Sequence, residues 1–121
     1  MKIAVTSDKN NMQGKVPKRY NKANYLMILE TDTGEILQTY ERNHFANGDI
    51  FFGQKTVEWN CEAIICGEIE REPFAVLAED SYVTRYNGTG CTIKEALKRM
   101  ETYQLTCITD HIGGRGCPSR F

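Results

Sequence analysis

The chain has 121 residues with a formal net charge of −1, and 40% of them are hydrophobic and 26% charged. This length allows one hydrophobic core and is too short for two, so a single domain is expected. The near-zero charge does not favour nucleic acid or a membrane surface as a partner, and no apolar stretch approaches the roughly 20 residues that span a bilayer.

The N-terminal segment predicts one strand followed by a basic loop. Residues 2–7 are rich in β-branched side chains and predict the strand, and the polar stretch 9–14 predicts a loop. Because the strand pattern begins at once, with no signal-peptide core before it, a cytoplasmic location is expected. Four cations and a tyrosine then lie within residues 15–22. Such a run is usually a solvated loop, and the alternative is an anion site.

A β-hairpin is expected next in the chain. Residues 25–30 form an apolar run, and residues 35–40 form a second run after the turn sequence Thr-Asp-Thr-Gly at 31–34. Aspartate and glycine suit such a turn, so the two runs are expected to pair as antiparallel strands. Residues 41–48 are polar and predict a connection. His44 lies there and is expected to be a solvated loop residue rather than a ligand.

The strand at the centre of the fold is expected within residues 61–69, which read Cys-Glu-Ala-Ile-Ile-Cys-Gly-Glu-Ile. An apolar run with helical patterns on both sides is typical of a strand covered on both faces. Gly67 ends the run and is expected to turn the chain out of the sheet. In α/β folds ligands tend to bind at that edge.

Three helices and a fifth strand complete the predicted elements. Residues 49–60 predict a helix with Asp49 as its N-cap, and residues 73–80 predict a second helix with its proline in the first turn. Residues 82–86 predict the fifth strand. The sequence Thr-Ile-Lys-Glu at 92–95 is a capping box before an apolar stripe that ends at Met100, so a third helix is expected there.

These elements follow the order β-β-β-α-β-α-β-α. The first three strands are expected to be antiparallel, and the later strands parallel because helices connect them. The sequence therefore predicts an α/β fold with a five-stranded mixed sheet flanked by helices, ribonuclease H-like in topology. The domain is expected to cover residues 1–104, and residues 105–121 form a C-terminal tail that contains glycine and cysteine.

Four blocks of this chain together resemble a known family. They are Met1–Asp8, Tyr25–Glu35, Ala63–Ile69 and Tyr86–Leu97. In this order they are similar to the dinitrogenase iron–molybdenum cofactor-binding family, which includes accessory proteins of the NifX and NafY type and the C-terminal part of NifB-type proteins. The resemblance covers about residues 1–103. It implies a ribonuclease H-like fold and a non-enzymatic role, related to nitrogen fixation, as carrier of an iron–sulfur or iron–molybdenum cluster, with a cluster-assembly or recipient protein as partner.

Two segments depart from the family pattern. Members typically carry His-Phe-Gly-Arg-Ala after the first loop, where this chain has Arg-Tyr-Asn-Lys-Ala at 19–23. Arginine stays protonated and has no lone pair for a metal, but Lys18, Arg19 and Lys22 could contact an anionic cluster through their charge. Glutamates also stand at 68 and 70 where glycines are common, which disfavours close approach of a bulky cofactor.

The C-terminal tail contains a second candidate site. Cys107, His111 and Cys117 lie within eleven residues on a glycine-rich segment, and thiolate and imidazole are ligands of zinc and iron–sulfur clusters. The alternative is a flexible tail with incidental cysteines. The chain has five cysteines, an odd number that predicts reduced thiols rather than a disulfide framework.

The remaining cysteines are expected to be mainly buried small residues. Cys66 and Cys91 would complete a cluster site if the tail folds back over the sheet. Cys61 and Cys66 are five apart, so on one extended strand they are expected to face opposite sides of the sheet.

Catalytic functions are not favoured by the sequence. The central strand contains no carboxylate of the kind that two-metal nucleases need, and no glycine-rich phosphate loop occurs. Two functions stay open: a cluster-binding carrier, and a cofactor-free interaction or regulatory module whose basic loop contacts an acidic partner. Thiol redox chemistry through Cys107 and Cys117 is a third, weaker alternative.

Overall fold

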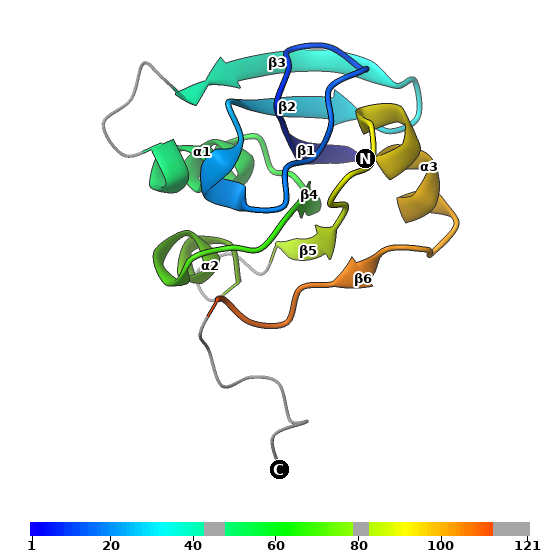
Figure 1. Ribbon diagram of the computed structural model, residues 1–121. Helices are drawn as coiled ribbons and strands as arrows, with labels where there is room; N and C mark the ends of the chain where they lie inside the picture. The colour runs from blue at the N-terminus through cyan, green and yellow to red at the C-terminus, as the bar shows by residue number, and fades with distance from the viewer. Residues whose placement is uncertain (43–47, 79–82, 113–121) are drawn as a thin grey trace.

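A six-stranded mixed sheet runs through the centre of the computed structural model, which describes residues 1–42, 48–78 and 83–112 (Figure 1). The strands lie in the order β3-β2-β1-β4-β5-β6. Their bounds are Lys2–Ser7 (β1), Tyr25–Glu30 (β2), Glu35–Glu41 (β3), Ala63–Cys66 (β4), Thr84–Asn87 (β5) and Thr106–Cys107 (β6).

Three α-helices cover the two faces of the sheet. Gly48–Glu58 (α1) and Arg71–Ala78 (α2) lie on one face, and Ile93–Glu101 (α3) lies on the other (Figure 1). A short 3-10 turn, Tyr20–Lys22, lies in the long connection between β1 and β2. No helix in the described part of the chain is long and apolar enough to cross a bilayer.

The sheet divides the hydrophobic core into two clusters. The α3-side cluster contains Ile3, Val5 and Ile65 with residues of α3, and the α1/α2-side cluster contains Ala4 and Ile64 with residues of α1 and α2. Successive side chains of β1 and β4 therefore enter opposite clusters, as the alternation of a strand requires. Full burial of each large aliphatic side chain contributes about 1.5–3 kcal/mol, so these two central strands hold the layers together.

Most of the predicted elements are confirmed. β2 and β3 form the antiparallel hairpin, and the central strand pairs in parallel with β1 and with β5. The capping box is also present, because the Glu95 N–H donates to Thr92 Oγ1 at 3.2 Å and the Thr92 N–H donates to Glu95 Oε1 at 2.9 Å. The parallel pairing brings the carboxyl ends of β1, β4 and β5 to one edge of the sheet, called here the loop edge.

Two predictions about the elements were wrong. The sheet has six strands rather than five, because Thr106–Cys107 pairs antiparallel with β5 inside the segment that was expected to be a tail. Two residues are too few to show the alternation of apolar and polar side chains by which a strand is predicted from sequence. β6 forms through its hydrogen bonds with β5. Asp49 is not the N-cap, because α1 already begins at Gly48.

The ribonuclease H-like topology and the domain boundary at 104 stay predictions, and His44 and Cys117 lie outside the described residues.

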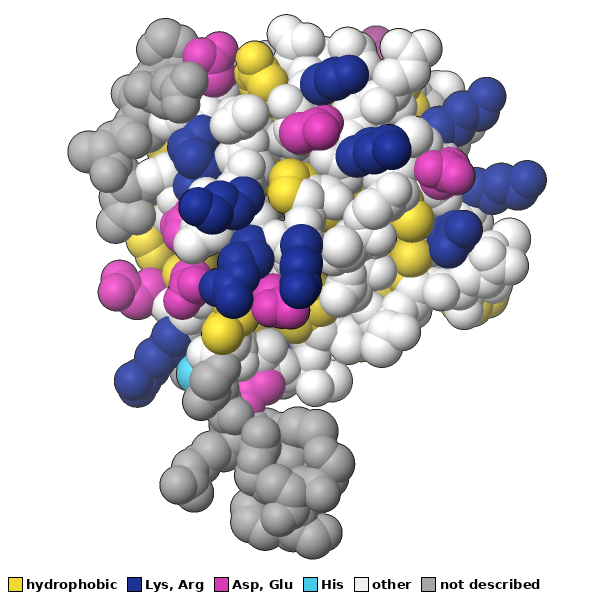
Figure 2. Space-filling model, viewed as in Figure 1, with side chains coloured by type: hydrophobic (Ala, Val, Ile, Leu, Met, Phe, Trp, Pro, Cys, Tyr) yellow, Lys and Arg dark blue, Asp and Glu magenta, His cyan; other side chains and the backbone are white. Residues whose placement is uncertain are grey.

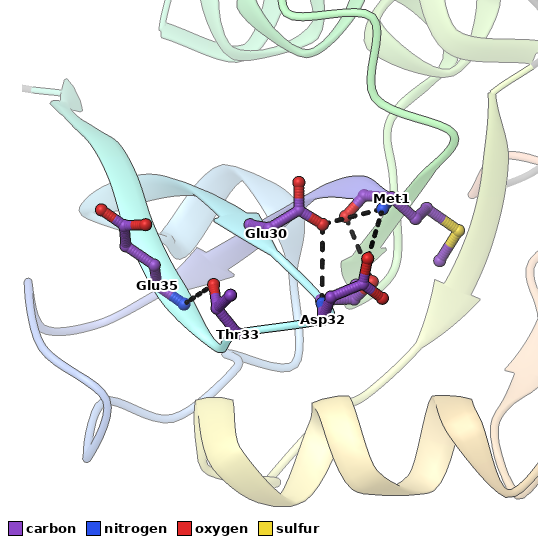
Figure 3. A network of polar contacts seen from close by, with 6 residues as sticks. Met1, Glu30, Asp32, Thr33 and Glu35 are labelled. Atoms are coloured by element: carbon purple, nitrogen blue, oxygen red, sulfur yellow. Dashed lines mark hydrogen bonds and ion pairs between the residues drawn. The ribbon is translucent and has the colours of Figure 1, made fainter.

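A polar network closes the hairpin against the start of β1 (Figure 3). The α-amino group of Met1 donates to Glu30 Oε2 at 2.7 Å and lies 3.8 Å from Asp32 Oδ2. The hydrogen bond with Glu30 raises the pKa of the amino group above its ordinary value of 8.0, and it lowers the pKa of the Glu30 carboxyl below 4.5. The network joins residue 1 to the turn that follows β2.

The Glu30→Gln change should remove a pH-dependent part of the stability. The raised amino pKa stabilises the fold below pH 8.0, and this contribution is lost as the pH rises through the folded-state pKa. The lowered Glu30 pKa stabilises the fold above pH 4.5, and this contribution is lost as the pH falls. The free energy of unfolding in urea can be measured for both proteins between pH 3 and pH 10. The variant should differ most from the parent chain between pH 4.5 and pH 8.0. Glu35→Gln is the control, because only the backbone N–H of Glu35 joins the network.

Candidate functional site

The loop edge is covered by residues 15–22, called here the basic loop. Beside β4 the Glu68 N–H donates to the Lys18 carbonyl at 2.8 Å, and the Tyr20 N–H donates to the Glu68 carbonyl at 2.7 Å. Near α3 the Val16 N–H donates to the Cys91 carbonyl at 2.9 Å. The basic loop therefore crosses the carboxyl ends of β4 and β5 as an ordered segment.

Gly67 permits the contact between the basic loop and β4. A Cβ atom on Gly67 would lie 2.2 Å from the Lys18 carbonyl oxygen and 2.3 Å from that of Pro17. Both atoms belong to the backbone, so a side chain cannot be fitted by a change of rotamer. The prediction that Gly67 ends the central strand is confirmed, since β4 ends at Cys66.

Arg42 fixes the far end of the basic loop. Its guanidinium donates to the carbonyl of Tyr20 at 2.8 Å and to that of Ala23, pairs with the Asp49 carboxylate, and lies 4.5 Å from the centre of the Phe52 ring. Tyr20 is fully buried, and its hydroxyl donates to the Asp49 carbonyl at 3.0 Å. Sequence reasoning missed Arg42, because an arginine at the end of an edge strand looks like any solvated cation.

Three predicted site residues, Lys18, Arg19 and Lys22, are exposed on the basic loop. Figure 2 shows Lys and Arg side chains on this side of the molecule with carboxylates among them. The Arg19 guanidinium lies 3.8 Å from the Glu70 carboxylate, and both side chains are more than 40% exposed. Such a pair contributes at most about 1 kcal/mol, so Arg19 can exchange Glu70 for another anion at low cost.

A cleft of about 300 Å³ opens beside the basic loop. It is lined by Glu68, Ile69, Asn87, Ile108, Asp110, His111 and Ile112. The Ile112 N–H donates to the Ile69 carbonyl at 2.8 Å, which ties the segment after β6 to the loop edge. Backbone and side chains from three strand ends therefore form the cleft.

His111 contributes the imidazole ring among the residues that line this cleft. Its Nδ1 lies 2.9 Å from the Ile112 carbonyl oxygen, and a carbonyl can only accept, so this contact requires a proton on Nδ1. In the neutral ring the lone pair is then on Nε2, which lies 3.5 Å from Asp110 Oδ1. A backbone partner on one ring nitrogen is the usual arrangement of a histidine that can bind a metal through the other.

Cys66 and Cys91 are buried on opposite faces of the sheet. Cys66 belongs to the α1/α2-side cluster and is fully buried, which strongly raises the pKa of its thiol. Cys91 belongs to the α3-side cluster and is 8% exposed. One ion or cluster cannot contact both thiols in this arrangement, because the sheet lies between them.

The expectation that Cys61 and Cys66 face opposite sides of the sheet was wrong. Both side chains lie in the α1/α2-side cluster. Cys61 precedes β4, which begins at Ala63, so the alternation of the strand does not apply to it. Burial raises the pKa of the Cys61 thiol to about 11, so the thiol is protonated at neutral pH.

Cys107 and His111 are placed on different sides of the sheet. Cys107 pairs with Tyr86, and paired residues of an antiparallel ladder project to the same face. Tyr86 packs against the α3-side cluster, whereas the His111 ring meets Phe74 of the α1/α2-side cluster at 5.8 Å. Within residues 1–42, 48–78 and 83–112, no three His, Cys, Asp or Glu side chains are grouped to hold a metal.

The Gly67→Ala change should destabilise the protein by about 2–3 kcal/mol, because its methyl group overlaps two carbonyl oxygens that cannot move independently of the backbone. Gly53→Ala is the control, since its Cβ would meet the Val76 side chain at 3.2 Å and no backbone oxygen. Urea unfolding measures both changes. Equal stabilities of the two variants would contradict the role assigned to Gly67.

The Arg42→Met change should cost about 2–4 kcal/mol, because it leaves two carbonyls and the Asp49 carboxylate without their charged donor. The control is Lys22→Met, which removes one exposed cation from the basic loop. It should change the free energy of unfolding by less than about 0.5 kcal/mol. Urea unfolding compares the two variants. Hydrogen exchange should show faster exchange of the Ala23 amide in Arg42→Met, because its bond to the Tyr20 carbonyl is no longer supported.

Comparison with solved structures shows that the fold is shared with other proteins. The apo form of the orange protein from Desulfovibrio gigas matches with a TM-score of 0.77 at 17% identity, over 90% of this chain and 93% of that chain. A proposed NifB protein from Thermotoga matches with a TM-score of 0.70 at 21% identity, over 97% of both chains. A proposed dinitrogenase from Methanocaldococcus jannaschii matches with a TM-score of 0.62 at 19% identity, over 88% and 95%.

A comparison with curated proteins finds no match. A family model described as dinitrogenase iron-molybdenum cofactor matches residues 1–103, from the start of β1 to the residues just after α3. This match includes the basic loop, Gly67 and the turn before α3, which are the parts that form the loop edge. The chain therefore belongs to the dinitrogenase iron–molybdenum cofactor family.

Proposed function

We propose that this protein is a small, non-enzymatic accessory protein that holds an iron–sulfur or iron–molybdenum cluster and passes it to another protein. Membership of the family supports a role connected with such a cofactor. The observation that carries the proposal is the ordered basic loop at the carboxyl ends of β1, β4 and β5. Ligands of α/β sheets generally bind at this edge.

The cargo would be held mainly by charge. Sulfide-bridged clusters with anionic ligands carry negative charge, and Lys18, Arg19 and Lys22 present three exposed cations to it. The carboxylates of Glu68 and Glu70 reduce the net charge of the loop edge. This compensation favours weak binding and ready release, which is the property that a carrier needs.

Metal donors would come from the segment after β5. The Nε2 atom of His111 lies 3.5 Å from Asp110 Oδ1 in the cleft beside the basic loop, and the proposal assigns His111 as a metal donor there. Cys117 is proposed as a second donor from its place in the sequence. Cys107 would join them only with a change in β6, because it lies on the α3 side of the sheet. Cys66 and Cys91 are the least suited of the proposed contacts, since both must leave a core cluster to reach a ligand.

A cofactor-free interaction module is the alternative function. It is favoured by the absence of a three-donor metal group among the described residues and by the burial of Cys66 and Cys91. In this case the basic loop would contact an acidic partner protein. The ion pair between Arg19 and Glu70 would then open to admit a partner carboxylate.

Anaerobic incubation with iron and sulfide, with and without molybdate, separates these functions. In anaerobic equilibrium dialysis, which also detects weak binding, the carrier should retain stoichiometric metal and show charge-transfer absorption. The triple variant Lys18→Glu, Arg19→Glu, Lys22→Glu should retain at least about tenfold less, because three attractive charges become repulsive. Cys117→Ser and His111→Ala should change the absorption spectrum, because each removes a metal donor.

The matched control is the triple variant Lys94→Glu, Lys98→Glu, Arg99→Glu, which makes the same change in net charge with exposed residues of α3. It should retain metal like the parent chain. A folded parent protein that stays colourless and free of metal would contradict the carrier function. The interaction module would then be the better description, and loss of an acidic partner in Arg19→Glu would support it.

A further inference from the structure

A second cleft lies at the edge of the sheet opposite the loop edge. Its volume is about 470 Å³, and it adjoins the amino ends of β1, β4 and β5 and the end of α3. Figure 3 shows Met1 and Asp32 above this helix. The lining residues are Met1, Thr31, Asp32, Glu62, Ala63, Thr84, Tyr86, Met100, Glu101 and Tyr103. We call it the tyrosine cleft.

The tyrosine cleft contains two exposed large hydrophobic side chains. Within the described part of the chain, the large hydrophobic side chains that are exposed are Met1 at 41% and Tyr103 at 93%, and both line this cleft. Tyr86 and Met100 contribute more apolar surface to its wall. Tyrosine and methionine are enriched in protein interfaces, and tyrosine often dominates their binding energy.

Tyr103 is held in an unusual backbone conformation. Its φ is 59°, in the left-handed region that glycine normally occupies after a helix. The Tyr103 N–H donates to the Met100 carbonyl at 3.1 Å, and the Gln104 N–H donates to the Arg99 carbonyl at 2.7 Å. A bulky residue in this region costs about 1–2 kcal/mol. The fold accepts this cost and displays an aromatic ring to solvent.

The charges around the tyrosine cleft are mainly negative. Asp32, Glu62 and Glu101 contribute three carboxylates, against the single α-amino group of Met1. That amino group is already engaged by Glu30 and Asp32. Glu62 and Glu101 form no ion pair with another residue of 1–42, 48–78 or 83–112, so their charges remain available to a partner.

We propose that the tyrosine cleft docks a lysine- or arginine-bearing segment of a partner protein. The cation would lie over the Tyr103 ring and between the Glu62 and Glu101 carboxylates, while its aliphatic stem covers Met100. A cation over an aromatic face gains about 0.5–2 kcal/mol in addition to the ion pairs. An acidic segment would meet three carboxylates and is excluded by repulsion.

The probe is the peptide acetyl-Arg-Gly-Lys-Gly-Arg-amide, with the peptide in which glutamate replaces each cation as its counterpart. Titration of ¹⁵N-labelled protein should shift the amide signals of residues 101–104 and of Glu62 with the basic peptide only. Tyr103→Phe should bind equally well, because the ring face is kept. Tyr103→Gly relieves the left-handed strain, so it should stay folded while its affinity falls at least about fivefold.

Charge reversal supplies the second comparison. Glu62→Lys with Glu101→Lys should abolish binding, whereas Glu35→Lys with Glu72→Lys makes the same charge change at exposed positions outside the cleft and should leave most of the affinity. Equal weakening by both double variants, or unchanged binding by Tyr103→Gly, would overturn the proposal. These variants leave the basic loop intact, so their outcome is independent of the cluster experiment.

Discussion

The close approach of the basic loop to Gly67 is the constraint on which the loop edge depends. With no side chain at 67, the carbonyls of Pro17 and Lys18 can lie where a Cβ atom would otherwise be. The two backbone hydrogen bonds with Glu68 then fix the direction of the basic loop. The burial of Tyr20 and its contacts with Arg42 and Asp49 continue the same arrangement toward α1.

The two departures from the family pattern meet in space. The family resemblance places a histidine at the position of Arg19 and a glycine at the position of Glu70. The structure places their side chains 3.8 Å apart as an exposed ion pair. Each change therefore offsets the charge introduced by the other. Because both side chains are exposed, this ion pair can open and close at low cost.

Patterns that depend on local sequence were predicted well. The hairpin, the central strand and the capping box each follow from a few adjacent residues, and the structure has all three. The parallel pairing of the later strands was also predicted, from the helices that connect them. Three features that depend on particular distant contacts were not predicted. β6 forms because it pairs with the free edge of β5. Arg42 is structural because it bonds to the Tyr20 carbonyl and the Asp49 carboxylate. Cys61 lies in the same core cluster as Cys66 because it precedes β4 and does not follow the alternation of the strand.

The charge of the two edges of the sheet also could not be predicted from the sequence. A net charge of −1 shows no preference for a partner, yet the loop edge displays Lys18, Arg19 and Lys22. The opposite edge displays Glu62 and Glu101 around the tyrosine cleft. Parallel strands separate the two edges because all of their carboxyl ends lie together and all of their amino ends lie together. On the two proposals above, the cargo and the partner protein would be bound on different surfaces, and the carboxylates of the tyrosine cleft would repel an acidic cargo.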